Sequence, residues 1–129
     1  MVLSSLLRRR SDDDVEPAPF DIGEIATILK NERRRAVIDH IDVLGEVDLG
    51  TLADIISADE QDVPIGEADT KSRKTVYVAL HQTHLDKLAD LDIVEAPDRG
   101  SGMIRPGPAF DDAVRVLEAI RTAQRGERP

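Results

Sequence analysis

Residues 70–94 constrain the fold more than any other segment of this 129-residue sequence. Apolar and aromatic side chains, with one histidine, recur there every three or four positions. Such spacing predicts one amphipathic helix from about Thr70 to Asp90. Its buried face should hold Val76, Tyr77, Leu80, His84, Leu88 and Leu91. The opposite face should hold Lys71, Ser72, Lys74, Thr75 and Val78, with Arg73 near the boundary and Gln82 further along.

A β-hairpin is expected directly after this helix. The residues DIVEA (92–96) have the composition of a strand, and MIR (103–105) that of a returning strand. The connector PDRGSG between them is rich in turn-forming residues and can close a hairpin. The predicted hairpin therefore spans residues 92–105, and Pro106 and Pro108 should end it.

Three shorter helices are predicted before the long one. The first is capped by Asp21, and the second, over residues 32–44, ends at Gly45, where a left-handed backbone is least costly. The third spans residues 47–63 with Asp48 as its cap. Their inward positions repeat at helical spacing and are Ile22, Ile25, Ile28 and Leu29, then Val37, Ile38, Ile41 and Leu44, then Leu49, Leu52, Ile55 and Ile56.

This order of elements is typical of a winged helix-turn-helix domain, which is mainly α with a small β-hairpin as its wing. The length allows one compact domain, expected over residues 20–108. Within it, the helix over 47–63 would support a recognition helix at about residues 71–90. The connection between them, PIGEADT, is longer than the three or four residues of a minimal helix-turn-helix. Residues 1–19 should form a disordered tail and residues 125–129 a frayed end.

One further amphipathic helix is predicted at residues 109–124. Its seam is formed by Phe110, Ala113, Leu117 and Ile120. The seam either packs back on the first helix of the same chain or pairs with a second protomer. A homodimer is slightly favoured, because it would present two recognition helices to a two-fold DNA site.

Several classes of protein are excluded by composition. Cysteine is absent, so disulfides and thiolate metal sites are impossible. No apolar run approaches the roughly 18 residues of a membrane span, so no membrane partner is expected. In MVLSSLLRRR the leucines precede the arginines, which reverses the order of a secretory signal. These features favour a soluble, cytoplasmic protein.

Catalytic and metal-binding motifs are weak. His81 and His84 are spaced to share a metal, but no convincing third ligand accompanies them, and His84 falls on the buried face. A phosphate-binding glycine loop is missing, and a domain of this size leaves little room for a substrate pocket. We expect no enzymatic activity, no metal and no cofactor.

The net charge of -9 at first argues against a DNA partner. However, 17 of the 26 acidic residues are Asp, Lys occurs 4 times against 13 Arg, and only three residues are aromatic. This profile resembles that of proteins from halophiles that accumulate salt. In molar salt, repulsion between charges is screened within about 3 Å. The distribution of the basic residues is then more informative than the net charge.

The basic residues form clusters that suit a DNA-binding winged helix. On the recognition helix, arginine and glutamine can bond base edges, while lysine and serine hold phosphates. At the wing, arginines can reach the DNA backbone or the minor groove. The candidate contacts on the helix are Lys71, Ser72, Arg73, Lys74, Thr75 and Gln82, and those on the wing are Arg99 and Arg105.

A third cluster, Arg33, Arg34 and Arg35, falls in the first turn of the helix over residues 32–44. The helix dipole does not favour cations at that end. Two interpretations stay open with equal weight: an external anion such as DNA phosphate, or a solvated face paired with acidic neighbours.

The segments ILKNERRRAVIDHI, DLGTLADII and KTVYVALHQTHLDKLADLDIVE carry a resemblance to a known family. Through them, residues 22–104 resemble a winged helix-turn-helix domain family of uncharacterised proteins from halophilic archaea. Two positions depart from its pattern: Asp86 stands where proline is common, and Asp92 where glycine is common before the wing. The resemblance implies a DNA-binding transcriptional regulator.

A protein-protein interaction module with the same fold, which does not bind DNA, is the main alternative. The acidic charge of residues 20–108 favours it. The two functions differ in what they require of the surface over residues 71–75: if Glu67 and Asp69 neutralise that surface, DNA binding is excluded. A dimer whose acidic surface imitates DNA is a third alternative, but the acidic residues are scattered.

Overall fold

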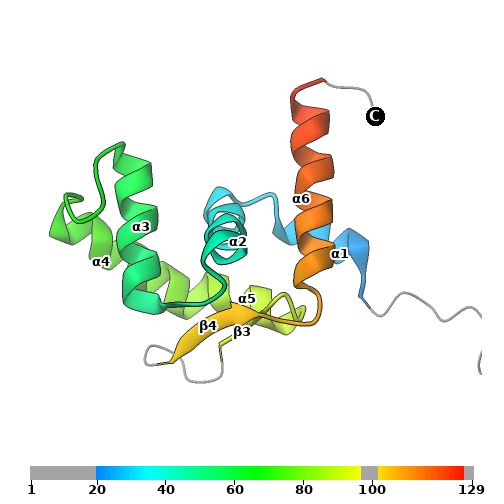
Figure 1. The fold of residues 1–129 in the computed structure, drawn as a ribbon, viewed down its shortest axis with the longest axis horizontal. Coiled ribbons are helices and arrows are strands. Elements are labelled where there is room, and N and C mark those ends of the chain that lie inside the picture. Colours follow the sequence, from blue (N-terminus) through cyan, green and yellow to red (C-terminus); the bar gives the residue numbers. More distant parts are fainter. Residues whose placement is uncertain (1–19, 97–101, 127–129) are drawn as a thin grey trace, which may run out of the picture.

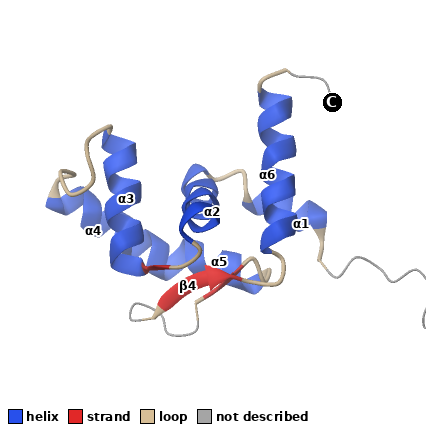
Figure 2. Cartoon of the chain, in the orientation of Figure 1, coloured by secondary structure: helices blue, strands red, loops and turns tan. Residues whose placement is uncertain are grey.

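The computed structural model describes residues 20–96 and 102–126 (Figure 1). The predicted tail at 1–19, Arg99 and the last three residues lie outside the described residues. The described chain is mainly helical with a small antiparallel sheet (Figure 2). Its elements are α1 (Ile22–Ile28), α2 (Glu32–Leu44), β2 (Val47–Asp48), α3 (Leu49–Gln61), α4 (Thr70–Ala79), η1 (Leu80–His84), α5 (Leu85–Asp90), β3 (Val94–Glu95), β4 (Met103–Pro106) and α6 (Phe110–Gln124).

Side-chain caps begin the first four helices. Asp21 accepts a hydrogen bond from the backbone of Glu24, and the carboxylate of Asp48 accepts one from Thr51, as the sequence predicts. Asn31 caps α2 in the same way. Gly45 ends α2 with a positive φ of 84°, a conformation that glycine adopts at little cost.

The sheet has three strands in the order β2-β4-β3. The predicted hairpin is present: Val94 pairs with Pro106 and Glu95 with Arg105, so Pro106 belongs to the strand that it was expected to follow. The third strand was missed. Val47 and Asp48 were assigned to the start of a helix, but they pair with Ile104 and Met103. Two residues are too few to show strand periodicity, and their partners lie more than fifty positions away.

The long helix predicted over residues 70–90 is interrupted by a π turn at η1. The backbone N–H of Leu85 donates to the carbonyl of Leu80, five residues back instead of four. The wider turn lets Leu85 join Leu80, His84 and Leu88 in the core, with 5% of Leu85 exposed. In a regular α-helix Leu85 would lie on another side of the helix from Leu80. The sequence pattern predicts the helix but not this turn.

The chain crosses itself closely after α5. Asp92 adopts a positive φ of 61°, a conformation that glycine tolerates better than residues with a side chain. Gly107 lies against it: a Cβ on Gly107 would be 2.4 Å from the carbonyl oxygen of Asp92. Two backbone bonds hold the crossing, from Gly107 to Ile93 and from Ala109 to Asp92. The exit from the sheet therefore requires glycine at position 107.

Helix α2 lies in the middle of the fold, with α3 on one side and α1 and α6 on the other (Figure 1). Helix α6 buries Phe110, Ala113 and Leu117 against its own chain. Arg121 also forms two 2.8 Å hydrogen bonds with the carboxylate of Asp39 in α2. Of the two arrangements considered for the α6 seam, packing within the chain is the one observed. The apolar seam thus gives no support to a homodimer.

No helix within residues 20–96 and 102–126 combines the length and apolar character needed to cross a membrane.

Candidate nucleic-acid interface

The outward side of α4 and η1 carries an exposed stripe, here called the outer stripe. It consists of Lys71, Lys74, Thr75, Val78 and Gln82. Their spacing of three and four residues places them along one face of the helix. The opposite side of the same helix holds Val76 and Leu80 in the core. The amphipathic pattern of the sequence therefore predicted this surface correctly.

Within the described chain, the acidic residues before α4 form no ion pair with the lysines of the outer stripe. One oxygen of Asp69 accepts from the Ser72 backbone at 2.8 Å, and the other accepts from the Ser72 hydroxyl and the Gln61 amide at 2.9 and 2.8 Å. These bonds, led by that from the Ser72 backbone, lower the pKa of Asp69. Lys71 and Lys74 form no ion pair with any residue that the structure describes, Glu67 included.

The other polar candidates on α4 have partners within the chain. Arg73 lies beside α3, with its Nε 3.3 Å from Asp54. The Ser72 hydroxyl completes the cap, and the Thr75 hydroxyl donates to the Lys71 carbonyl at 3.0 Å. The side chain of Gln82, in contrast, makes no hydrogen bond with any described residue. Sequence reasoning missed the contact of Arg73, because it depends on how α3 and α4 pack.

A cleft of about 600 Å³ lies between the start of α3 and the first turns of α4. Both signs of charge line it, since Asp48 and Asp54 face the same space as Arg73 and Lys74. The side-chain hydroxyl of Thr51 and its backbone N–H lower the pKa of Asp48, which holds that carboxylate ionised. The cleft is therefore not a simple anion site.

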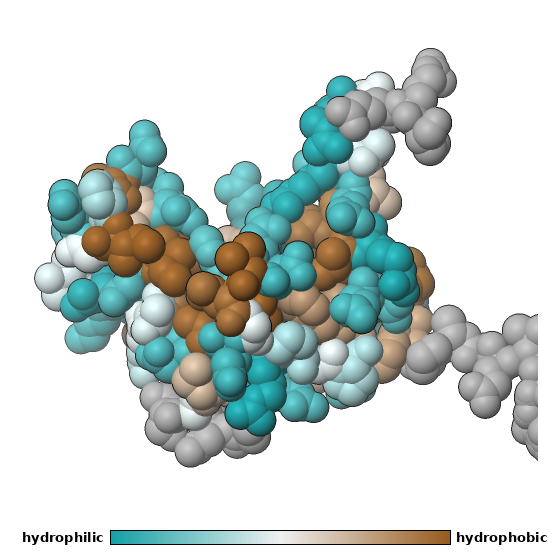
Figure 3. Space-filling model, viewed as in Figure 1, coloured by the Kyte–Doolittle hydropathy of each residue, from teal (hydrophilic) through white to brown (hydrophobic). Residues whose placement is uncertain are grey.

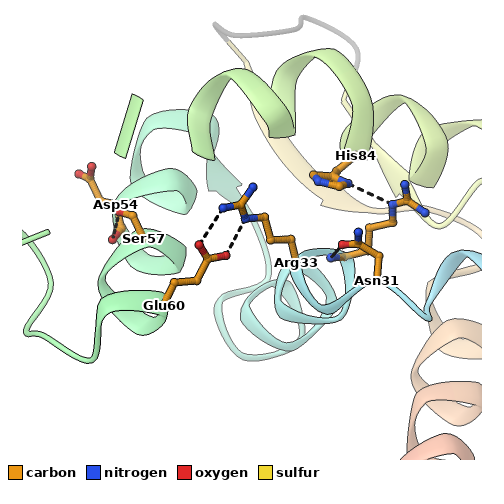
Figure 4. A network of polar contacts seen from close by, with 7 residues as sticks. Asn31, Arg33, Asp54, Ser57, Glu60 and His84 are labelled. Carbon is orange, nitrogen blue, oxygen red and sulfur yellow. Dashed lines mark hydrogen bonds and ion pairs between the residues drawn. The ribbon is translucent and has the colours of Figure 1, made fainter. Parts of the chain in front are cut away.

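Two arginines of the 33–35 run are used inside the fold (Figure 4). Arg33 forms a fork with Glu60 of α3, at 2.6 and 2.8 Å, so that for this arginine the acidic neighbour is the partner within the fold. Arg34 donates to Nδ1 of His84 at 3.1 Å and to the carbonyl of Ile28 at 3.2 Å. Arg35 makes no side-chain hydrogen bond or ion pair within the described residues.

His84 is 8% exposed, and its ring accepts the hydrogen bond from Arg34. Burial, followed by the nearby charges of Arg34 and Arg33, lowers its pKa. Because Nδ1 accepts the Arg34 hydrogen bond, the geometry fits the neutral ring with its proton on Nε2. The predicted burial of His84 is confirmed, and its ring connects the π turn to Arg34 of α2.

At the hairpin, Arg105 extends from β4 and is half exposed. Its guanidinium lies 3.6 Å from Glu46, the residue before β2. Arg99, the other candidate there, lies outside the described residues. The hairpin thus places one weakly paired cation at the surface.

The chain belongs to a domain family of unknown function (DUF7344), whose family model matches residues 26–105. The matched segment runs from α1 to β4 and excludes α6. No curated protein and no solved structure matches the chain.

Proposed function

We propose that this protein is a winged helix-turn-helix transcriptional regulator that binds duplex DNA. Helix α4 enters the major groove through its outer stripe, and the β3–β4 hairpin lies beside it as a wing. One observation carries the proposal: Lys71 and Lys74 lie exposed on α4, while the nearest acidic residue in sequence, Asp69, is occupied as a helix cap. Lysines in this position hold phosphates and fix the helix on the duplex.

The order of elements supports the winged-helix assignment. A central helix, α2, is followed by a short strand, and α3 and α4 then pack on each other. The hairpin comes next in the chain and completes the sheet with β2 at its other edge. This is the arrangement in which α3 supports α4 and leaves one side of α4 exposed.

The acidic net charge is compatible with this function in a salt-rich cell. The composition, with many Asp and few Lys, resembles that of halophile proteins. Screening at molar salt confines repulsion between phosphates and distant carboxylates to about 3 Å. Direct contacts of Lys71 and Lys74 with phosphates would then dominate the electrostatic contribution to binding.

The test is fluorescence-anisotropy binding to random-sequence duplex DNA over a potassium chloride series. The variant is Lys71→Glu with Lys74→Glu, and the matched control is Lys30→Glu with Lys87→Glu, which changes the net charge equally. We expect binding that weakens with salt, is lost in the first variant and is retained in the control. Absence of binding at the lowest salt that keeps the fold, or equal loss in both variants, would contradict the proposal.

A second candidate function, binding of a partner protein, is favoured by an exposed apolar surface. Val43 and Leu44 at the end of α2 are 83% and 49% exposed, and Met103 of β4 is 39% exposed. A cleft of about 420 Å³ lies beside Leu44, and Gly45, Glu46 and Arg105 also line it. Hydrophobic residues also gather on the face between α3 and α6 (Figure 3). Surfaces of this kind are typical of interaction sites.

This function makes a different prediction about variants. The partner would be identified by stoichiometric co-purification from the native host. The Val43→Asp variant should no longer bind it, whereas the Lys71→Glu/Lys74→Glu variant should still do so. The opposite pattern would exclude the apolar surface as the binding site.

A further inference from the structure

Val78 is an unusual residue for the middle of a solvent-facing helix surface. Its β-branched apolar side chain is 39% exposed. Lys74 and Thr75 precede it by one turn, and Gln82 follows it by four residues. The core of this segment is supplied from the other side of the helix by Val76 and Leu80, so Val78 is not required for packing.

Val78 and Gln82 are four residues apart and lie on the same exposed face of the helix. In a regular α-helix, a residue four positions on has advanced slightly beyond one full turn. Gln82 lies on the outward side of the π turn over Leu80–His84. The same turn directs His84 and Leu85 into the core. The two outward side chains therefore form a pair, separated along the helix axis by about 6 Å.

The remaining residues of this surface contribute little to sequence discrimination. Lysine contacts with phosphate position a protein without reading the bases. Arg73 is paired with Asp54, and the hydroxyls of Ser72 and Thr75 bond to groups at the start of their own helix. Val78 and Gln82 are thus left as the side chains of the outer face with unused capacity for contact.

We infer that Val78 and Gln82 are specificity-determining residues that select A·T base pairs in the major groove. This inference rests on the proposed DNA-binding function. Glutamine forms paired hydrogen bonds with N6 and N7 of adenine, and an apolar side chain contacts the C5 methyl group of thymine. The N6 and N7 atoms of adenine and the C5 methyl group of thymine are exposed only in the major groove. The separation of Val78 and Gln82 by about 6 Å along the helix axis would place their contacts on nearby base pairs.

The experiment first selects a preferred duplex from a random library, using the native full-length chain at one fixed salt concentration. Affinity is then measured for that duplex and for two modified forms of it. Uracil in place of thymine removes only the methyl group, and 7-deazaadenine in place of adenine removes only N7. Neither modification changes the phosphates. The proteins are the native chain, Val78→Ala, Gln82→Ala and the control Val43→Ala.

We expect the native chain and Val43→Ala to lose at least about fivefold in affinity on each modified duplex, the lower limit for a specific base contact. Val78→Ala should lose less affinity than the native chain when uracil replaces thymine, because alanine presents a smaller apolar surface to the methyl group. Gln82→Ala should lose less affinity than the native chain when 7-deazaadenine replaces adenine. If binding occurs but no A·T-containing sequence is selected, or the variants respond like the native chain, the inference is wrong and the proposed function stands. If the native chain binds no duplex at all, both the inference and the proposed DNA-binding function are wrong.

Discussion

The side chain of Arg34 donates a hydrogen bond to Nδ1 of His84 across 3.1 Å. The two residues are fifty positions apart, and their contact joins the first turn of α2 to the π turn of the long helix (Figure 4). A protonated His84 could not accept this bond, and it would place a third positive charge beside Arg33 and Arg34.

Stability should therefore fall at mildly acidic pH. In the unfolded chain, histidine titrates near pH 6.5, whereas burial and Arg34 lower the pKa of His84 in the fold. Above pH 6.5 both states are neutral at this residue, and its contribution is constant. Below pH 6.5 the unfolded state binds the extra proton, so the free energy of unfolding decreases, by at most about 1.4 kcal/mol per pH unit. Urea unfolding between pH 7.5 and 5.5 measures this slope.

The control for the pH dependence is His84→Asn, whose amide oxygen can accept from Arg34 without titrating. Its unfolding free energy should depend less on pH than that of the native chain. His81→Gln should leave the slope unchanged. If His81→Gln and His84→Asn have the same effect, the Arg34 contact is not the cause.

Gly107→Ala should destabilise the fold. A Cβ at this position would be 2.4 Å from the Asp92 carbonyl oxygen, and a backbone atom cannot move aside as a side chain can. We expect a loss of about 1–3 kcal/mol, as for other overpacked sites. Gly50→Ala is the control, because its Cβ would meet only the Asp48 side chain at 3.4 Å. Thermal unfolding should show a lower midpoint for the first variant alone.

Asp92→Gly should stabilise the fold. Asp92 adopts a left-handed backbone with φ of 61°, in which a side chain is disfavoured. Removing the side chain should raise the free energy of unfolding by up to about 1 kcal/mol, because the backbone strain is relieved. Asp90→Gly changes the same residue type at the last residue of α5, where the backbone is helical, and should cost about 0.3 kcal/mol, because Asp is itself a poor helix former. If chemical denaturation gives both changes the same sign, the conformation of Asp92 is not strained.

The unfolding midpoint should not depend on protein concentration. Leu117 of α6 is buried against its own chain, so Leu117→Ala should cost about 2–5 kcal/mol by creating a cavity. A dimer formed through α6 would instead unfold at higher temperature as concentration rises. Calorimetric scans over a hundredfold range of concentration distinguish the two.

The sequence predicted the features that depend on neighbouring residues. Asp21, Asp48 and Gly45 determine helix ends through contacts within a few positions, and helical periodicity is enough to expose Lys71 and Val78. These features need no knowledge of distant parts of the chain.

What the sequence could not predict arises from long-range packing. Strand β2 exists because Val47 meets Ile104. Arg33 was a candidate for an external anion, but α3 presents Glu60 to it across 27 positions. The pairing of Arg73 with Asp54 has the same origin. In each case the partner is defined only after the helices have packed.

The π turn also affects how this domain can change in evolution. Deleting one residue between Leu80 and Leu85 would return their hydrogen bond to the four-residue spacing of an α-helix. Both leucines, and everything after them, would keep their places in the core. The deletion would remove one residue from the solvent-facing side of the helix only. The long helix can thus gain or lose one surface residue without disturbing its interior, and alignments of related sequences are expected to show a single-residue gap at this turn.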